Sequence, residues 1–305
     1  MRQPQGSKIE SGPRRADVRR DAGALAAALP PLLIEAQRIA HTVAAGFHGR
    51  RRAGPGETFW QHRPYAFGDS VASIDWRQSA RSTGRLYVRQ NEWEAAATVW
   101  IWRDPSRSLD YTSEARLPAK RRRADTLAVA LALLLAEGGE RIGAIAQKPR
   151  VFHGRSAGER LCAALLSEDF DEAGSVPPDA PIRAFSRVVY ISDFLCDLDA
   201  LGAAAARSAA VGAQGVMVQI NDPAEENFPF NGRTEFEDAE SADRLTFGDA
   251  ARLGDDYRLA FANHRARLKS LCNTLGWPLL LHRTDAPAPL ALMALHSALN
   301  PRGSM

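Results

Sequence analysis

One carboxylate and two hydroxyls follow a predicted strand at regular spacing, as Asp104-x-Ser106-x-Ser108. Residues 98–103, T-V-W-I-W-R, are rich in β-branched and aromatic types, which predicts a buried strand. In a tight loop after that strand, all three side chains can turn toward one point. Such oxygen ligands suit a hard divalent cation, so the spacing predicts a Mg²⁺ or Mn²⁺ site. The structural alternative is a polar turn in which these oxygens accept backbone N–H groups.

A second aspartate, Asp193, follows another apolar segment, residues 187–192. If the two strands are parallel, Asp104 and Asp193 lie at the same edge of the sheet, where α/β folds form their sites. Two converging carboxylates strengthen the cation hypothesis. The alternative for Asp193 is an N-cap of the helix that follows.

From residue 98 onward, predicted strands alternate with predicted helices. The strands are expected at 98–103, 141–146, 150–153, 187–192, 215–220 and 277–282, and the helices at about 119–138, 157–167, 197–211, 255–275 and 287–298. Residues 221–254 are expected to be irregular. This alternation predicts an α/β fold, with a mostly parallel sheet covered by helices on both faces.

The N-terminal third is organised differently. Residues 1–23 are basic, lack apolar periodicity and are expected to be a disordered tail. An extension over 24–97 is predicted to hold one helix, ending near Gly46, followed by short strands. The α/β domain is expected at 98–300. Residues 1–90 contain 15 Lys and Arg against 7 Asp and Glu, so this third could bind nucleic acid, an acidic partner or the chain's own second domain.

Composition narrows the class of protein. The chain has 45% hydrophobic and 25% charged residues, which is typical of soluble globular proteins. Its 3 cysteines are well separated and fit neither a disulfide framework nor a zinc cluster. No apolar run reaches the roughly 18 residues of a membrane span, and the N-terminus lacks a signal peptide, so a cytoplasmic location is expected.

Residues 54–94 carry a long and specific string of motifs. It contains R-x-Y-x-x-G-D, then I-D-W-R-x-S-A-R, then L-x-V-R and a closing glutamate; the residues singled out are Arg63, Tyr65, Gly68, Asp69, Asp75, Trp76, Arg77, Ser79, Arg81, Arg85 and Arg89. I-S-D-F at 191–194 and T-D-x-P at 284–287 fit as well. With these motifs the chain resembles the bacterial family called domain of unknown function 58, over about residues 30–295.

The resemblance implies a von Willebrand factor A-like domain and a protein that binds without doing chemistry. A metal-ion-dependent adhesion site would use Asp104, Ser106 and Ser108 as its first ligand loop and Asp193 as its later acidic position. The metal could then accept a carboxylate from a partner. Family members are usually encoded beside a MoxR-type AAA+ ATPase, which implies that ATPase and a protein client as partners.

This chain departs from the adhesion-site pattern at two positions. The usual threonine has no clear counterpart, since residues 154–182 contain only Ser156, Ser167 and Ser175. Arg103 replaces an apolar residue directly before Asp104. We expect that its guanidinium could pair with Asp104 and substitute for the metal.

Alternatives stay open for the role of residues 57–94 and for the role of the two aspartates. The alternating Arg and Asp residues of 57–94, set among aromatic residues, suit either a buried ion-pair network or a docking face. Single-stranded nucleic acid is disfavoured because acids match the arginines and no standard nucleic-acid motif is present. A metal-dependent phosphohydrolase built on Asp104 and Asp193 is the enzymatic alternative. It would need a third acid or a lysine at the same strand edge, which the sequence does not clearly offer.

Overall fold

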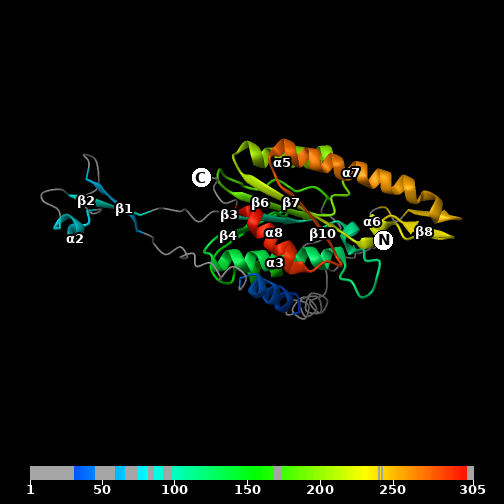
Figure 1. The fold of residues 1–305 in the computed structure, drawn as a ribbon, viewed down its shortest axis with the longest axis horizontal. Coiled ribbons are helices and arrows are strands. Elements are labelled where there is room, and N and C mark those ends of the chain that lie inside the picture. Colours follow the sequence, from blue (N-terminus) through cyan, green and yellow to red (C-terminus); the bar gives the residue numbers. More distant parts are fainter. Residues whose placement is uncertain are drawn as a thin grey trace, which may run out of the picture.

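A six-stranded sheet forms the centre of the computed structural model (Figure 1). The structure describes residues 31–44, 59–65, 74–81, 86–91, 98–167, 174–239, 241 and 243–300, so the predicted tail 1–23 lies outside the described residues. The strands are β3 (Thr98–Arg103), β4 (Arg141–Ala144), β5 (Arg150–Phe152), β6 (Arg187–Ser192), β7 (Gln214–Asn221) and β10 (Leu279–Arg283). Their order is β10-β7-β6-β3-β4-β5, and only β5 runs antiparallel to its neighbour.

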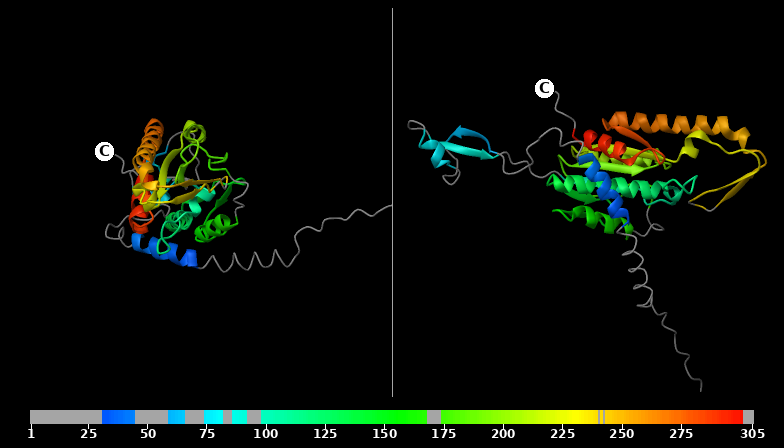
Figure 2. Two further views of the ribbon diagram at one scale, coloured as in Figure 1. Left: turned by 90° about the vertical axis from the view of Figure 1, so that its right-hand side faces the viewer. Right: turned by 60° about the horizontal axis from the view of Figure 1, so that its bottom comes forward.

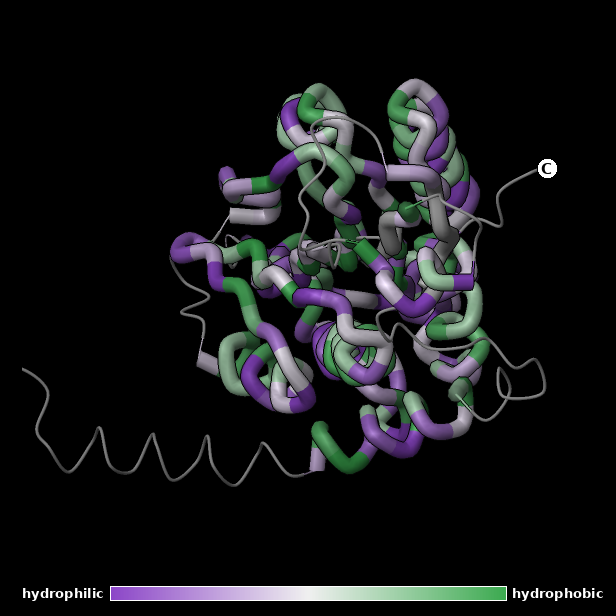
Figure 3. Tube along the Cα trace, turned by 90° about the vertical axis from the view of Figure 1, so that its left-hand side faces the viewer, coloured by the Kyte–Doolittle hydropathy of each residue, from purple (hydrophilic) through white to green (hydrophobic). Residues whose placement is uncertain are grey.

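Helices cover both faces of this sheet, which confirms the predicted mostly parallel α/β fold (Figure 1). On one face lie α3 (Lys120–Glu137), α4 (Ala157–Leu166), α8 (Ala288–Leu299) and a helix over 31–44. On the other face lie α5 (Leu198–Ala210) and α7 (Gly254–Leu275). Figure 3 shows polar and apolar residues alternating around the helical turns, as expected of helices that bury one side.

The strands bury both of their faces because successive side chains point in opposite directions. On β3, Val99 and Ile101 join the core under α3, whereas Trp100 and Trp102 join the core under α5 and α7. Gly143 lies against the ring of Trp100, where an added Cβ would come within 2.3 Å of the ring. A glycine in this strand therefore makes room for an indole from its neighbour.

The helix over 31–44 belongs to the main core. Its buried residues, among them Leu32, Ala36 and Val43, lie in the same apolar cluster as α3 and α8. Glu35 also pairs with Arg122 of α3, at 2.8 Å. Figure 2 shows this helix crossing α3. The sequence placed the helix in the N-terminal extension, and in the structure it contributes to the core of the α/β part.

A small unit is built from the motif-bearing segment. It holds β1 (Phe59–Pro64), α2 (Trp76–Ser79) and β2 (Tyr87–Asn91), and the two strands pair antiparallel. This matches the predicted short strands of 57–97.

Residues 221–254 are structured, which contradicts the expected irregular stretch. They contain α6 (Pro223–Asn227), the hairpin β8 (Thr234–Glu237) and β9 (Arg244–Phe247), and the 3-10 helix η3 (Ala250–Leu253). β8 alternates half-buried and exposed residues, whereas three of the four residues of β9 are exposed, and neither strand has a long apolar run, so hydrophobic periodicity gave little signal. Across the described residues, no helix is long and apolar enough to span a membrane.

Candidate functional site

The site lies at the carboxyl edge of the sheet, where the order of strands reverses. The chain lays β4 and β5 on one side of β3, then crosses back to place β6 on its other side. A crevice outside the strand ends is expected at such a switch point. Asp104 and Asp193 follow β3 and β6 there, and the N–H of Asp104 donates to the carbonyl of Ile191 at 2.9 Å. The predicted convergence of the two aspartates is therefore confirmed.

Asp104 is almost fully buried and its carboxylate is held by two donors. One oxygen accepts the backbone N–H of Ser106 at 2.8 Å, and the other accepts the hydroxyl of Ser192 at 2.5 Å. Ser192 in turn accepts the N–H of Phe194 at 2.7 Å. Burial raises the pKa of Asp104, with the nearby Asp193 adding to the shift, while its hydrogen bonds oppose it. The two carboxylates thus share one electrostatic environment.

The serines of the loop also face one point. The hydroxyls of Ser106 and Ser108 lie 3.0 Å apart at the start of η2 (Arg107–Asp110). The sequence therefore placed Asp104, Ser106 and Ser108 correctly as one cluster.

Lys120 also reaches the site. It is the first residue of α3, the helix that covers one face of the sheet beside β3. Its ammonium lies 2.7 Å from the carboxylate of Asp193, and it also pairs with Glu225 of α6. The Lys120 side chain is 1% exposed. Burial alone would lower its pKa, but the attraction of the two carboxylates outweighs burial and the pKa is raised. The group is therefore a buried ammonium, and it supplies positive charge where the metal was expected.

Asp193 is not the cap of the next helix. Its Oδ1 accepts the N–H of Leu195 at 3.0 Å, whereas Asp197 caps α5 by accepting the N–H of Asp199 at 2.9 Å. The helix-cap alternative for Asp193 is therefore wrong, and its second oxygen faces Lys120.

Glu225 comes from a capping box on α6. Asp222 accepts the N–H of Ala224 at 2.9 Å, and Glu225 accepts the N–H of Asp222 at 2.8 Å. Burial raises the pKa of Tyr111, and the negative charges of Asp222 and Glu225 raise it further. The Lys120 ammonium lies 5.8 Å from the centre of the Tyr111 ring. Asp222 and Glu225 extend the acidic site toward the hairpin.

Arg103 does not take the role that the sequence suggested. Its side chain lies on the face covered by α3, and its Nε is 2.7 Å from the carboxylate of Asp125. It also donates to the backbone carbonyls of Asp104 and Leu165, at 3.1 and 3.0 Å. Successive side chains of β3 point to opposite faces of the sheet, so Arg103 shares the face of Ile101 and reaches Asp125 and not the Asp104 carboxylate.

The three arginines after Lys120 also bind separate segments. These contacts are from Arg121 to Asp110 and the Ser106 carbonyl, from Arg122 to Glu35, and from Arg123 to the Thr284 carbonyl. Four consecutive cations at a helix N-terminus oppose the helix dipole, so these partners are needed to stabilise that turn.

The donor set of the first loop fits a hard cation. Asp104 supplies a carboxylate and the two serines supply neutral oxygens, as Mg²⁺ or Mn²⁺ requires. Asp193 does not fit in the same way, because Lys120 already neutralises it. Three of the four predicted ligands therefore suit a divalent cation, and the fourth holds an ammonium.

The motif residues of the N-terminal unit fall into three groups. Gly68, Asp69 and Arg85 lie outside the described residues. Arg63 and Arg89 lie on β1 and β2, and Tyr65 follows β1. Asp75, Trp76, Arg77, Ser79 and Arg81 lie at or beside α2.

Within that unit, Ser79 has a clear structural role. Its hydroxyl donates to the carbonyl of Asp75 at 2.7 Å and accepts the N–H of Tyr87 at 2.9 Å, so it joins α2 to β2. Trp76, by contrast, is 61% exposed.

Sequence reasoning missed Lys120, Ser192, Asp222 and Glu225 as site residues. A signal existed for the last two, because Asp222-x-x-Glu225 has the spacing of a capping box. Lys120 stood inside a run of four basic residues, and nothing in that run singled it out.

Comparison with known proteins places the chain among relatives. It matches the family model described as "Protein of unknown function DUF58" over residues 61–267. An uncharacterized protein of Mycobacterium tuberculosis is 32% identical over 278 residues, which cover 86% of this chain and 85% of that protein. One from Mycobacterium bovis gives the same figures. The crystal structure of the conserved hypothetical protein BatB from Bacteroides thetaiotaomicron aligns with 67% of this chain and 97% of its own, at 15% identity and a TM-score of 0.38.

Proposed function

We propose that this chain, which belongs to the DUF58 family, is a non-enzymatic protein–protein interaction module of von Willebrand factor A-like architecture. The observation that carries the proposal is the meeting of Asp104, Ser106 and Ser108 with Asp193 at the switch point of the sheet. The resemblance of the motifs to the family supports the von Willebrand A-like part. The strand order, with a single antiparallel edge strand, is compatible with it.

The burial of Asp104 favours binding over chemistry. The residue is 1% exposed and both of its oxygens accept hydrogen bonds, so it is poorly placed to attack a substrate. The loop oxygens can instead hold Mg²⁺ or Mn²⁺. A bound divalent cation would offer an open coordination position to a carboxylate of the partner.

The partner that we propose is a MoxR-type AAA+ ATPase, with the pair acting on a protein client. This proposal rests on the family resemblance of residues 54–94 and 191–194.

The test is direct binding of the MoxR-type ATPase from the same organism to the purified full-length chain in the presence of Mg²⁺ and ATP. We expect Asp104→Asn to weaken binding by about tenfold, because it removes the charge of the first loop while keeping its shape. Asp199→Asn is the matched control, since Asp199 lies past the same strand edge and its side chain is 93% exposed. Failure of the unmodified chain to bind the ATPase would contradict the proposal.

A metal-dependent phosphohydrolase using Asp104 and Asp193 is the second candidate. Lys120 and Glu225 favour it, because a lysine and a third acid do converge on the strand edge. Against it stand the burial of Asp104 and a serine at the position two residues later, where aspartate-based phosphotransferases typically carry an acid. A phosphatase screen with Mg²⁺ or Mn²⁺ decides: hydrolysis that Asp104→Asn abolishes would favour the enzyme.

A further inference from the structure

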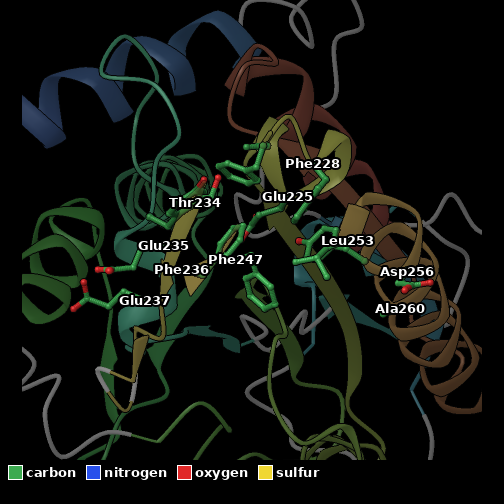
Figure 4. Close-up of a pocket in the computed structure, with 14 residues that line it drawn as sticks. Glu225, Phe228, Thr234, Glu235, Phe236, Glu237, Phe247, Leu253, Asp256 and Ala260 are labelled. Atoms are coloured by element: carbon green, nitrogen blue, oxygen red, sulfur yellow. The ribbon is translucent and has the colours of Figure 1, made fainter. Parts of the chain in front are cut away.

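A pocket of about 870 Å³ lies beside the acidic site, between α6, the β8–β9 hairpin and the first turns of α7 (Figure 4). Its walls carry the aromatic residues Phe228, Phe230, Phe236, Phe247 and Tyr257. This volume falls within the range of ligand pockets, and apolar walls with few polar groups are typical of them. The hairpin and the start of α7 extend past the main sheet in Figure 1.

The rings hold the pocket in shape. The Phe228 ring lies 4.6 Å from Tyr257 and 5.2 Å from Phe230, measured between ring centres. Phe236 contacts Phe230 edge-on at 5.3 Å. Phe228 also adopts a left-handed backbone conformation, with φ of 45°, which is unfavourable for a residue with a large side chain. Its ring contacts therefore fix both the turn after α6 and the pocket wall.

Phe228 is the buried member of this set, and the other four aromatic residues are half-buried. These four rings thus remain partly exposed to solvent around the pocket. Aromatic residues, Phe and Tyr among them, are enriched at protein–protein interfaces.

Acidic side chains line the same pocket. They are Glu225, Glu235, Glu237 and Asp256, and the residues that line it include neither Lys nor Arg. Over residues 222–258 the chain has eleven acidic and four basic residues, a formal charge of −7. Arg244 pairs with Glu235 and Glu237, and Lys120 pairs with Glu225, so part of this charge is compensated. Lys120, Arg265 and Arg283 pair with Glu225 and Glu226 from outside this range, and with them counted the formal charge is −4. The surroundings of the pocket therefore remain negative.

Aromatic walls and acidic lining residues together indicate which class of ligand the pocket can bind. A negative rim repels nucleic acid and anionic lipid, whereas it attracts cations and steers them toward the pocket. Aromatic walls favour an apolar side chain and also interact with Lys or Arg through the faces of the rings. We infer that this pocket docks a segment of a partner protein in which an apolar or aromatic side chain is flanked by Lys or Arg.

This inference rests on the proposed function, because both require a protein partner. It adds a second contact surface, and Glu225 belongs to both, since it pairs with Lys120 and lines the pocket.

The test uses three dye-labelled synthetic peptides and fluorescence anisotropy with the full chain. One peptide alternates Phe and Leu with Arg, the second has Glu in place of Arg, and the third has Ser in place of Phe and Leu. We expect the first to bind and the other two to bind at least about tenfold more weakly. Equal binding of all three peptides, or no binding of the first, would overturn the inference.

Two matched pairs of variants locate the binding. Asp256→Lys should weaken it by about tenfold, whereas Asp255→Lys, on the adjacent and 97% exposed side chain, should leave it within about twofold. Phe247→Ser should weaken it, whereas Leu259→Ser, on a 62% exposed residue of α7, should not. Circular dichroism checks that each variant is folded. Unchanged binding by folded Asp256→Lys and Phe247→Ser proteins would overturn the inference.

The protein's own basic N-terminal segment is a competing occupant. Replacing Arg14, Arg15, Arg19 and Arg20 with Ser in the full chain tests it. Peptide binding that becomes about tenfold tighter would assign the pocket to that segment and overturn the inference. Unchanged binding supports a partner segment.

The two proposals fail in different ways. Asp104→Asn should reduce binding of the ATPase and leave binding of the peptide unchanged. Peptide binding without ATPase binding would contradict the proposed partner and support the pocket, and the reverse result would overturn the pocket alone.

Discussion

The ammonium of Lys120 lies 2.7 Å from the carboxylate of Asp193, and both side chains are 1% exposed. The two residues are 73 positions apart in the chain. Asp193 follows β6, and Lys120 begins the helix that covers β3, so their pairing ties the two central strands to α3. The Lys120 ammonium thus lies at the same edge of the sheet as the oxygen ligands of Asp104, Ser106 and Ser108, which also suit a divalent metal.

Removing that cation should destabilise the protein. Lys120→Met leaves the buried carboxylate of Asp193 and the half-buried carboxylate of Glu225 without their partner, and breaking a buried pair typically costs about 3–5 kcal/mol. Urea denaturation near neutral pH measures the change in the free energy of unfolding. The control is Lys148→Met on an exposed loop residue, which should cost less than about 0.5 kcal/mol. A Lys120→Met protein as stable as the unmodified chain would contradict a charged pair at this position.

The same substitution should improve metal binding. Without the ammonium, Asp193 is free to join Asp104 and the serines as an oxygen ligand. Calorimetric titration of Mg²⁺ and Mn²⁺ into chelator-treated protein should therefore give about tenfold higher affinity for Lys120→Met than for the unmodified chain. Metal should also raise the melting temperature of the variant. Weaker binding by the variant would show that the ammonium does not compete with a metal.

A buried histidine should make stability depend on pH. His282 on β10 is 6% exposed, and burial, followed by the charge of Arg123, lowers its pKa from 6.5 to about 4. Between these values the unfolded chain takes up a proton and the native protein does not. Stability should therefore fall as the pH drops from 6.5 to about 4, by about 3 kcal/mol in total.

Denaturation curves at several pH values test this dependence. His282→Gln should flatten it, because the glutamine does not titrate. His153→Gln, on an exposed residue, should keep the slope of the unmodified chain. A slope that survives in His282→Gln would assign the effect to other groups.

The N-terminal unit offers a prediction about local structure. Ser79→Ala removes the acceptor of the Tyr87 N–H, so hydrogen exchange in residues 86–91 should become faster. Trp76→Ala, on an exposed ring, should leave that exchange unchanged. Mass spectrometry of the exchanged peptides measures both. Faster exchange in Trp76→Ala alone would show that the tryptophan, and not the serine, holds this unit together.

Much of the α/β fold follows from the sequence because the strands are continuous apolar runs. The predicted strand 98–103 coincides with β3, and 187–192 coincides with β6. The predicted helix 255–275 differs from α7 by one residue at its start. Parallel pairing then brings Asp104 and Asp193 to one edge, so half of the site could be predicted.

The rest of the site could not be read from periodicity. Lys120 reaches Asp193 because α3 begins at the edge where β3 ends, and this is a property of tertiary packing. The pocket depends on a hairpin whose short strands carry mostly exposed residues. Arg103 was misplaced because adjacency in the chain suggested contact with Asp104, whereas alternation along the strand sends its side chain to Asp125.

The basic first turn of α3 has a consequence for the order of folding. Its contacts join residues 73, 87, 105 and 161 positions apart, and contacts of such long sequence separation carry a high loop-closure cost. The helix over 31–44, β6, α6 and the segment after β10 must all be in place before this corner is complete. The acidic edge is therefore expected to assemble late, and a chain that has stalled on its folding pathway would lack the surface by which we propose its partner recognises it.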